Sequence, residues 1–546
     1  MDINIVIGGA AGQGLNIIEE IILKSLKKSG YYVFASKEIM SRIRGGINTT
    51  TIRISDSKKN GFKKFIDILI PLNEFVVDWI RNRINENTVI LDEKKLNFKE
   101  ISKNIGSGIY ENVVIAGIIG KIFNIELNIL KEIIVETFKN KSEKILSKNL
   151  IAIEKGFSKG KELNINIQTN KTNLDNKILI NGTQSVALGA LAGNCNFVSF
   201  YPMSPSTGVA IFLAQYAKEI GIVVEQFEDE ISAICASIGA WFSGARGFVT
   251  TSGGGFALME EAISLAGMSE NPLVIHIAQR PGPATGLPTR TIQADLNLVL
   301  NAGHGEFPRI IFAPSTVEDA FYLTQKSFNL ADKYQIPVFI LTDQFLMDSF
   351  YTTDTFSLDQ IENEYYIGLT NKDYKRYEIT KNGISIRGIP GFGDGIIIAN
   401  GNEHDEWGDI SENEYLNKIM PEKRMKKFDL IKKETLLPYF SGSEDYKTLV
   451  ISWGSTFFTV KEAIEELKNK KLAHLHFNQI WPINKNVSKF FEKAEKIVVI
   501  EGNLTGQFAD LLKKEFEITN INKILKYNGR QFYVEEIIEE IDKIHG

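Results

Sequence analysis

The sequence is poor in cysteine and histidine, and this scarcity limits the metal chemistry that the chain can support by itself. It has 2 cysteines, Cys195 and Cys235, and 6 histidines among 546 residues. Two separated cysteines form neither a disulfide framework nor a four-cysteine iron–sulfur or zinc site. The histidines show no metal-binding spacing such as HExxH. We therefore expect no metal site within this chain.

Long hydrophobic runs and a surplus of basic charge are absent as well. No uncharged apolar run reaches the roughly 18 residues of a membrane-spanning helix. The chain opens with Met-Asp-Ile-Asn-Ile-Val-Ile and passes directly into a glycine-rich loop, which is unlike a signal peptide. The net charge of -5 argues against a dedicated nucleic-acid binder. The expected location is the cytoplasm, with no membrane or nucleic-acid partner.

The composition is that of a globular enzyme, with 43% hydrophobic and 24% charged residues. Short apolar runs alternate with helical patterns, which predicts an α/β fold with several parallel sheets and right-handed crossovers. The polar stretch 156–177 has little periodicity and is predicted to be a linker. The predicted organisation is an α/β domain at 1–155, this linker, a second α/β domain at 178–350, an irregular connecting segment at 351–440 and a small α/β domain at 441–546.

A glycine-rich loop, GGAAGQG at 8–14, separates an apolar strand at 3–7 from an amphipathic helix. Its G-x-x-G-x-G spacing differs from the dinucleotide fingerprint. Glycines after a strand still allow the backbone to approach an anion at a helix N-terminus. A lone glycine loop is a weak signal, so a tight turn that shapes an interface is the favoured interpretation.

Four loops in the second domain follow predicted strands and carry polar residues. The first, YPMSPST (201–207), combines two prolines with Ser204, Ser206 and Thr207 at a helix start, a pattern that suits a bound carboxylate. The others are EDE (228–230), TTSGGG (250–255) and QRPGPATGLPTR (279–290). Taken singly, an acid in a first helical turn is explained by pairing with the helix dipole, and an arginine is explained by a surface ion pair. Because such loops meet at one edge of a parallel sheet, their convergence predicts a ligand site.

Two segments look like metal motifs but are not interpreted as such. GFGDG (391–395) contains the Gly-Asp-Gly of a magnesium–diphosphate motif, but it lacks the preceding apolar strand and a well-placed asparagine. GNEHDEWGD (401–409) groups acids around one histidine without a partner ligand. A turn with a role in domain contact is predicted there.

Taken together, these motifs resemble the alpha subunit of 2-oxoacid:ferredoxin oxidoreductases, with a gamma domain fused in front. GGAAGQG and EIMSRIRGGINTTTIRISD (38–56) are similar to the gamma domain. YPMSPST, EDEISAICASIGAWFSGARGFVTTSGGGFALM, QRPGPATGLPTRTIQADL, GNEHDEWG, WGST and EGNLTGQ are similar to the alpha subunit. The resemblance covers nearly the whole chain. It implies a gamma domain, a domain for the pyrimidine side of thiamine diphosphate, and a C-terminal domain like that of transketolase.

The resemblance implies oxidative decarboxylation of a 2-oxoacid, with transfer of its carbon skeleton to coenzyme A and of two electrons to ferredoxin. Thiamine diphosphate supplies the electron sink that protein side chains lack. The implied cofactor-binding residues are Ser252, Gly253, Gly254 and the catalytic Glu230, which contacts the aminopyrimidine ring. The implied substrate-binding residues are Ser204, which replaces the family's threonine, Pro205, Ser206, Thr207, and Arg280 or Arg290.

The resemblance and the cysteine count together imply that this chain is half of an enzyme. The reaction needs an iron–sulfur cluster and a magnesium–diphosphate site, and two cysteines cannot supply the cluster. A beta subunit is expected to carry Mg and a [4Fe-4S] cluster, with thiamine diphosphate at the interface of a heterodimer. The gamma–alpha fusion favours 2-oxoglutarate, converted to succinyl-CoA, or a broad range of 2-oxoacids. Pyruvate, branched-chain 2-oxoacids, a transketolase-like or E1-like subunit without ferredoxin, and a non-catalytic nucleotide-binding module remain alternatives.

Overall fold

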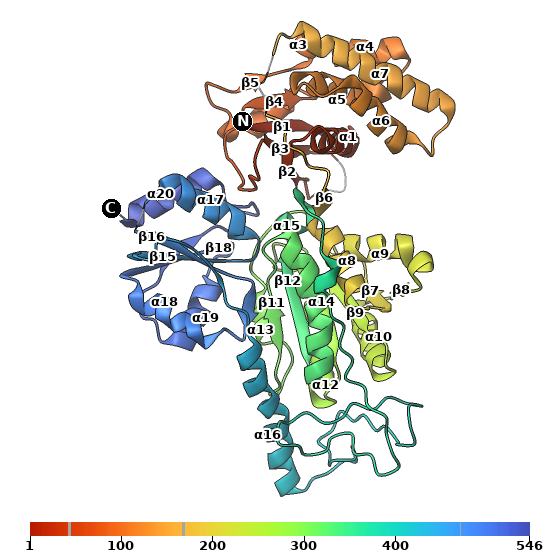
Figure 1. Cartoon of the computed structure of the whole chain (residues 1–546), viewed down its shortest axis with the longest axis vertical. Helices are drawn as coiled ribbons and strands as arrows, with labels where there is room; N and C mark the ends of the chain where they lie inside the picture. The colour runs from red at the N-terminus through yellow and green to blue at the C-terminus, as the bar shows by residue number, and fades with distance from the viewer. Residues whose placement is uncertain (42–44, 166, 168–169, 470, 546) are drawn as a thin grey trace. The chain divides into compact units, whose positions relative to one another are not determined.

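The computed structural model describes residues 1–41, 45–165, 167, 170–469 and 471–545. They form two compact units (Figure 1). Unit 1 consists of Met1–Asn181, Asp348–Thr355 and Tyr533–Glu535, and unit 2 consists of Gly182–Met347, Phe356–Phe532 and Glu536–Gly546. Both units are built from strands and helices, which confirms the predicted α/β class.

Unit 1 has a seven-stranded sheet in the order β5-β4-β1-β3-β2-β13-β6. The strands are β1 (Asp2–Ala10), β2 (Tyr32–Glu38), β3 (Ile47–Ser55), β4 (Ile68–Pro71), β5 (Val89–Ile90), β6 (Lys177–Asn181) and β13 (Phe350–Asp354). The sequence pattern predicts that β1 and β2 are neighbouring parallel strands. In the structure, β3 lies between them and is antiparallel to both. This sheet is therefore mixed, with β4 and β5 continuing β1 in parallel.

Alternate residues of β1 point into two apolar layers. Ile5 and Ile7 belong to the larger core cluster, together with α1 (Leu15–Lys28) and α5 (Glu111–Ile122), whereas Val6 packs in a smaller cluster with α2 (Phe75–Trp79). The other helices are α3 (Glu93–Leu96), α4 (Phe98–Ile105), α6 (Leu127–Phe138) and α7 (Glu143–Glu162), so residues 156–162 are helical. The period of two in β1 is that of a strand buried on both faces.

The main sheet of unit 2 has the order β17-β11-β12-β10-β9-β7-β8. Its strands are β7 (Phe197–Phe200), β8 (Val223–Gln226), β9 (Gly247–Thr251), β10 (Leu273–Gln279), β11 (Ile310–Phe312), β12 (Pro337–Asp343) and β17 (Gln479–Trp481). All pairings are parallel except that of β17 with β11, as the alternating pattern predicted. The helices of this part are α8 (Gly182–Ala192), α9 (Thr207–Ile220), α10 (Glu230–Phe242), α11 (Gly253–Leu258), α12 (Glu260–Met268), α13 (Leu296–Leu300), α14 (Val317–Tyr334) and α15 (Gln344–Asp348).

A second sheet of unit 2 has the order β14-β16-β15-β18-β19. Its strands are β14 (Tyr439–Gly442), β15 (Thr448–Trp453), β16 (Leu472–Phe477), β18 (Lys496–Glu501) and β19 (Asn522–Leu525), and its helices are α17 (Phe457–Leu467), α18 (Ser488–Lys493), α19 (Gln507–Phe516) and α20 (Val534–His545). An irregular segment and α16 (Glu414–Ile431) precede it. None of the helices in the described part of the chain has the length and apolar character needed to cross a membrane.

Gln293 joins the two sheets of unit 2. This buried residue lies in the loop between β10 and α13. Its backbone N–H donates to the Gly502 carbonyl at 2.7 Å, and its side-chain amide donates to the Trp453 carbonyl at 2.8 Å. Its side-chain oxygen accepts from Gly502 N at 2.8 Å, and its carbonyl accepts from Asn503 Nδ2 at 3.0 Å. The end of the β10–α13 loop is thereby held by the ends of β15 and β18.

Candidate active site

Glu230 is a buried carboxylic acid at the first position of α10. Asp229 caps this helix, because its side chain accepts a hydrogen bond from Ser232 N at 2.7 Å. Glu230 is 3% exposed, and its Oε1 has no hydrogen-bond partner among the described residues. Burial raises the pKa of Glu230, and the neighbouring Asp229 raises it further, while Arg280 lowers it. A carboxyl group in this state is suited to sharing a proton with a ligand.

The first turn of α11, Gly253–Gly255, lies against two carboxyl groups. A Cβ atom on Gly255 would lie 2.6 Å from Glu230 Oε1, and one on Gly253 would lie 2.4 Å from Asp295 Oδ2. Both positions therefore require glycine for the carboxyl groups to fit. Gly254 is exposed, and a Cβ there would meet only the Ala284 carbonyl, at 3.8 Å.

Three buried polar atoms around this turn have no hydrogen-bond partner within the described chain. They are Glu230 Oε1, Ser252 Oγ and Asp295 Oδ2. A buried polar group without a partner costs free energy, so such a cluster marks a place where a ligand supplies the missing partners. The sequence predicted Glu230 and Ser252 for this site but not Asp295. The only available signal for Asp295 was an acid just beyond the arginine loop, in QADL.

Arg280 brings two of the predicted loops together. It follows β10 directly, is half-buried, and donates from Nη1 to the Ser204 carbonyl at 2.8 Å. Burial lowers the pKa of Arg280, whereas Asp295 and Glu230 raise it. An arginine keeps its charge in such a setting. The site therefore holds a cation beside two buried carboxyl groups.

Arg290, the other candidate arginine, lies in a different place. The neighbouring Thr291 N donates to the Gly529 carbonyl at 3.3 Å, and a Cβ on Gly529 would lie 3.2 Å from Arg290 Cβ. Arg290 is thus set against the loop at Gly529, while Arg280 contacts the Ser204 loop.

The hydroxyls of the 201–207 loop differ in their surroundings. Ser204 is exposed, and Pro205 and Thr207 are half-buried. Ser206 is fully buried, and its Oγ donates to the Met203 carbonyl at 2.6 Å. The Ser206 hydroxyl therefore stabilises its own turn, which leaves Ser204 and Thr207 as the hydroxyls nearer to solvent.

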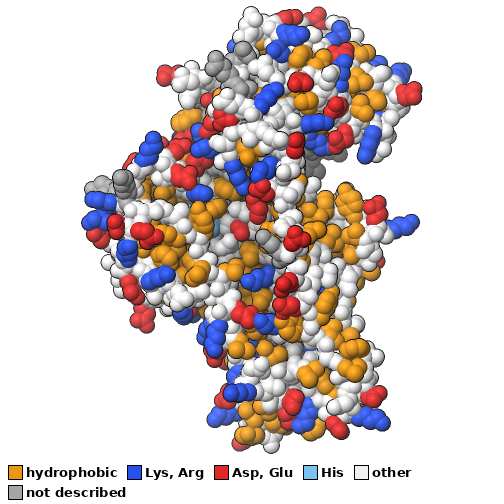
Figure 2. Space-filling model, viewed as in Figure 1, with side chains coloured by type: hydrophobic (Ala, Val, Ile, Leu, Met, Phe, Trp, Pro, Cys, Tyr) orange, Lys and Arg blue, Asp and Glu red, His pale blue; other side chains and the backbone are white. Residues whose placement is uncertain are grey.

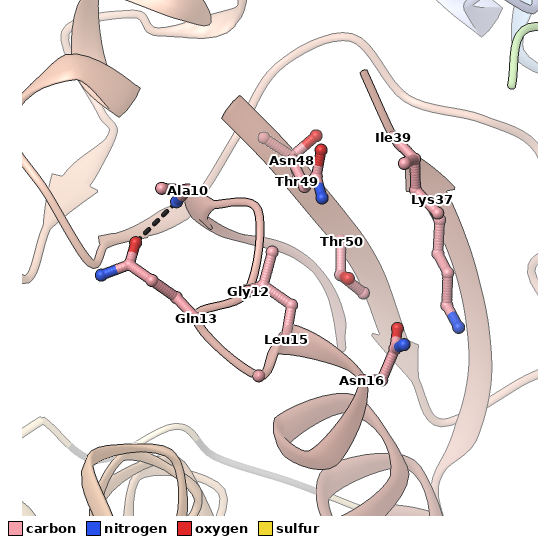
Figure 3. Close-up of a pocket in the computed structure, with 11 residues that line it drawn as sticks. Ala10, Gly12, Gln13, Leu15, Asn16, Lys37, Ile39, Asn48, Thr49 and Thr50 are labelled. Atoms are coloured by element: carbon pink, nitrogen blue, oxygen red, sulfur yellow. Dashed lines mark hydrogen bonds between the residues drawn. The ribbon is translucent and has the colours of Figure 1, made fainter. Parts of the chain in front are cut away.

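A pocket of about 230 Å³ in unit 1 lies between the glycine-rich loop, the start of α1, and strands β2 and β3 (Figure 3). It is lined by Ala10, Gly12, Gln13, Gly14, Leu15, Asn16, Lys37, Ile39, Asn48, Thr49 and Thr50. Gln13 Oε1 accepts from Ala10 N at 2.6 Å and fixes the loop. Thr49 Oγ1 is buried and, within the described residues, lacks a hydrogen-bond partner. Arg44 of the predicted gamma-domain motif lies outside the described residues.

Lys37 and the start of α1 give this pocket an electropositive side. Lys37 Nζ pairs with the buried Glu19 at 2.5 Å, so part of its charge is balanced. The first backbone N–H groups of a helix have no carbonyl partner within the helix and carry partial positive charge. The pocket therefore offers helix N–H groups, hydroxyls and one lysine, a set that suits an anionic group.

The acidic cluster around His404 is part of a buried ionic network. Glu403 Oε1 and Oε2 accept from Arg424 at 2.9 and 2.6 Å. Glu270 is buried with Lys423, whose Nζ lies 2.7 Å from Glu270 Oε1, and with Lys427. Within the described residues, no group of three His, Cys, Asp or Glu side chains is arranged to hold a metal ion. Glu403 thus ties this segment to α16, and the lysines of α16 tie that helix to Glu270 after α12.

Known proteins align with this chain over its whole length. Residues 188–422 match the family described as pyruvate flavodoxin/ferredoxin oxidoreductase, thiamine diphosphate-binding, and residues 4–159 match the pyruvate ferredoxin/flavodoxin oxidoreductase family. The "2-oxoacid:ferredoxin oxidoreductase subunit alpha" of Sulfolobus sp is 31% identical, with 100% of this chain and 97% of that protein aligned. The "2-oxoglutarate synthase subunit KorA" of Methanocaldococcus jannaschii is 33% identical over 63% of this chain and 94% of its own length.

A solved structure has the same fold. It is the 2-oxoglutarate:ferredoxin oxidoreductase of Magnetococcus marinus, described as having 2-oxoglutarate, coenzyme A and succinyl-CoA bound. It shares 29% sequence identity and a TM-score of 0.93, and 99% of each chain is covered. These findings confirm the resemblance drawn from the motifs. The chain belongs to the 2-oxoacid:ferredoxin oxidoreductases, as an alpha subunit with a gamma-type domain fused before a thiamine diphosphate-binding domain.

Proposed function

We propose that this chain is the alpha subunit of an enzyme that converts 2-oxoglutarate and coenzyme A to succinyl-CoA and carbon dioxide. Two electrons leave the substrate and reduce two molecules of ferredoxin. The 2-oxoglutarate synthase relatives and the Magnetococcus marinus structure support this substrate over pyruvate and branched-chain 2-oxoacids. An E1-like role without ferredoxin is the weaker alternative, since the relatives that align with the whole chain carry ferredoxin in their names.

The observation that carries the proposal is the buried carboxyl of Glu230, whose Oε1 has no hydrogen-bond partner among the residues that the structure describes. A ring nitrogen of the aminopyrimidine is a partner of matching chemistry, because a buried carboxyl with a raised pKa shares a proton readily. Ser252, Gly253 and Gly254 are proposed to contact the cofactor as well, because they precede Gly255, which lies against Glu230. Thiamine diphosphate, when bound, supplies the electron sink for decarboxylation. Glu230 is then the residue that holds and moves a proton at the cofactor.

Arg280 is proposed to bind the substrate carboxylate, with Ser204, Pro205 and Thr207 beside it. Arginine recognises carboxylates through paired N–H donors. Its Nη1 donates to the Ser204 carbonyl, and this hydrogen bond holds the guanidinium beside the 201–207 loop. Ser206 is proposed to support this site by stabilising the loop through its hydrogen bond to the Met203 carbonyl.

Arg280→Gln is expected to raise KM for 2-oxoglutarate by on the order of 10- to 100-fold, because hydrogen bonds to charged groups contribute about 1.5–3 kcal/mol. Steady-state kinetics of the complex co-purified with its partner subunits measures this. Arg290→Gln is the matched control and should change KM far less. A larger effect at Arg290 would reverse the assignment.

A beta subunit is proposed to carry the magnesium–diphosphate site and a [4Fe-4S] cluster, with thiamine diphosphate at the interface. Two cysteines in this chain, one buried and one exposed, cannot hold such a cluster. Apolar side chains gather on the α9–β8–α10 side of unit 2 (Figure 2). The exposed ones there include Ile211, Tyr216, Ile220, Val223 and Ile231. Exposed apolar surface of this kind, next to Glu230, suits a subunit contact.

The pocket at the glycine-rich loop of unit 1 is proposed to take a phosphate group of coenzyme A. Its helix N–H groups, Lys37 and the Thr49 hydroxyl, which has no hydrogen-bond partner in the described part of the chain, support this assignment. Asn16→Asp adds a negative charge in the first turn of α1, where an acid favours the helix but repels a bound phosphate. We expect KM for coenzyme A to rise on the order of 10-fold, with KM for 2-oxoglutarate unchanged.

The control for this substitution is Asn87→Asp, which makes the same change on an exposed loop of unit 1. It should leave both KM values as they are. An unchanged KM for coenzyme A in the Asn16 variant would move coenzyme A away from this pocket.

The reaction class itself is tested by viologen reduction with the complex from its native host. Reduction that requires both 2-oxoglutarate and coenzyme A supports the proposal. Activity with pyruvate or a branched-chain 2-oxoacid alone would keep the class and change the substrate. Thiamine-dependent turnover without viologen reduction would favour the E1-like alternative.

A further inference from the structure

Asp295 gives this site a second buried carboxyl group. A Cβ on Gly253 would lie 2.4, 2.6 and 2.7 Å from Oδ2, Cγ and Oδ1 of Asp295, so the carboxyl group lies flat against the glycine. Glu230 makes the same approach to Gly255, two residues further on. Neither Asp295 Oδ2 nor Glu230 Oε1 has a hydrogen-bond partner in the described chain. The two acids therefore flank the first turn of α11.

The backbone of Asp295 is fixed independently of its carboxyl group. Its N–H donates to Gln279 Oε1 at 2.9 Å, and Gln279 is the residue directly before Arg280. Two residues earlier, Gln293 is held by the second sheet of unit 2. The backbone of Asp295 is thus attached to the end of β10, directly before Arg280, and its carboxyl group makes no hydrogen bond to the described residues.

Arg280 is the cation that acts on both acids. Burial raises the pKa of Asp295 to about 6, and Arg280 opposes that rise. Arg280, in the loop after β10, is the charged group that bears on Asp295. Glu230, whose pKa responds to Asp229 and to Arg280, lies against Gly255 of the same turn. Asp295 therefore changes charge near pH 6. It does so beside Arg280, the cation whose guanidinium donates to the Ser204 carbonyl.

We propose that Asp295 is a positioning residue that competes with the substrate carboxylate for the charge of Arg280, and so sets the affinity for the 2-oxoacid. The proposal rests on the proposed role of Arg280. With Asp295 ionised, Arg280 is partly neutralised and attracts the substrate less. With Asp295 neutral, the full charge of Arg280 acts on the substrate, which stays ionised throughout.

The direction of the pH dependence follows. Below about pH 6 Asp295 is neutral and KM is low, and above it Asp295 ionises and KM rises. The wild-type enzyme should therefore show KM for 2-oxoglutarate rising several-fold, about 3- to 10-fold, from about pH 5.5 to about pH 8. The inhibition constant of glutarate, a dicarboxylate without the oxo group, should rise in parallel.

The test is Asp295→Asn in the intact complex, because asparagine keeps the size and removes the charge. At about pH 8 we expect KM and the glutarate constant to fall about 3- to 10-fold, with kcat within about twofold and the pH dependence of KM abolished. Asp445→Asn, on an exposed loop, is the control and should change nothing. An equal or higher KM in Asp295→Asn overturns the proposal, and so does a flat wild-type profile if that variant does not assemble.

A double substitution separates this proposal from the assignment of Arg280. In the Arg280→Gln background, Asp295→Asn should no longer lower KM, because the charge it competes for is gone. If Arg280→Gln leaves KM unchanged, the role of Arg280 and this proposal both fail. If Arg280→Gln raises KM but Asp295→Asn does not lower it, only the role of Asp295 fails.

Discussion

Glu230→Gln is expected to lower turnover of the assembled enzyme by about 10²–10⁴-fold, the usual cost of removing a positioned general acid–base. Glutamine keeps the size of the side chain in a position where a Cβ on Gly255 would already lie 2.6 Å from Glu230 Oε1. Assembly should therefore persist while the proton function is lost. Viologen reduction with 2-oxoglutarate and coenzyme A measures the loss.

The neighbouring Glu228 provides the matched control, because it is exposed and precedes α10. Glu228→Gln removes the same charge from the same segment and should change turnover less than about threefold. Thiamine diphosphate content, measured on the purified complexes, separates lost catalysis from lost cofactor. Near-normal turnover of Glu230→Gln with full cofactor content would place the catalytic acid elsewhere.

Glu270→Gln is expected to lower the free energy of unfolding by about 3–5 kcal/mol, because it leaves buried cations without their carboxylate. Glu270 is 1% exposed, and Lys423 and Lys427 are 0% and 1% exposed. Arg376 also approaches, donating to the Glu270 carbonyl at 2.7 Å. Urea unfolding of the purified complex, followed by tryptophan fluorescence, measures the change.

The pH dependence of this network has a defined sign. Burial lowers the pKa of Lys427 to about 8, from an ordinary value of 10.5. Between these two values the unfolded chain binds more protons, so this lysine makes stability rise with pH in that window. The lysines and Arg376 lower the pKa of Glu270 despite its burial, so its contribution is lost as pH falls through the acid range.

Glu434→Gln is the control for Glu270→Gln. Glu434 pairs with Lys333 at 2.6 Å, but both side chains are partly exposed to solvent. Surface pairs contribute about 0–1 kcal/mol. Equal losses from the two substitutions would show that the Glu270 network is not a stabilising element.

The local pattern of the sequence predicted the elements of unit 2 well. Strands such as β10 and β12 are continuous apolar runs, the signature of parallel strands buried on both faces. The hydroxyl, glycine and arginine loops after them meet because parallel strands end at one edge. Local pattern was therefore sufficient to place Glu230, Ser252 and Arg280 in one region.

Features that depend on distant parts of the chain could not be predicted in this way. β13 pairs with β2 and β6 although it lies far along the chain from β2. Lys423 reaches Glu270 across 153 residues. Asp295 could not be predicted, because one acid in a polar loop does not stand out in the sequence. Its approach to Gly253 and its buried Oδ2, which lacks a hydrogen-bond partner among the described residues, distinguish it in the structure.

The hydrogen bonds of Gln293 have a consequence for the entropy of substrate binding. A proline- and glycine-rich loop that had to be ordered by its ligand would spend part of the binding energy on that ordering. Here the loop end beside Asp295 is already attached to Trp453, Gly502 and Asn503. Because the second sheet of unit 2 already orders this loop end, binding of the 2-oxoacid costs less conformational entropy there. More of the binding free energy can then stabilise the transition state.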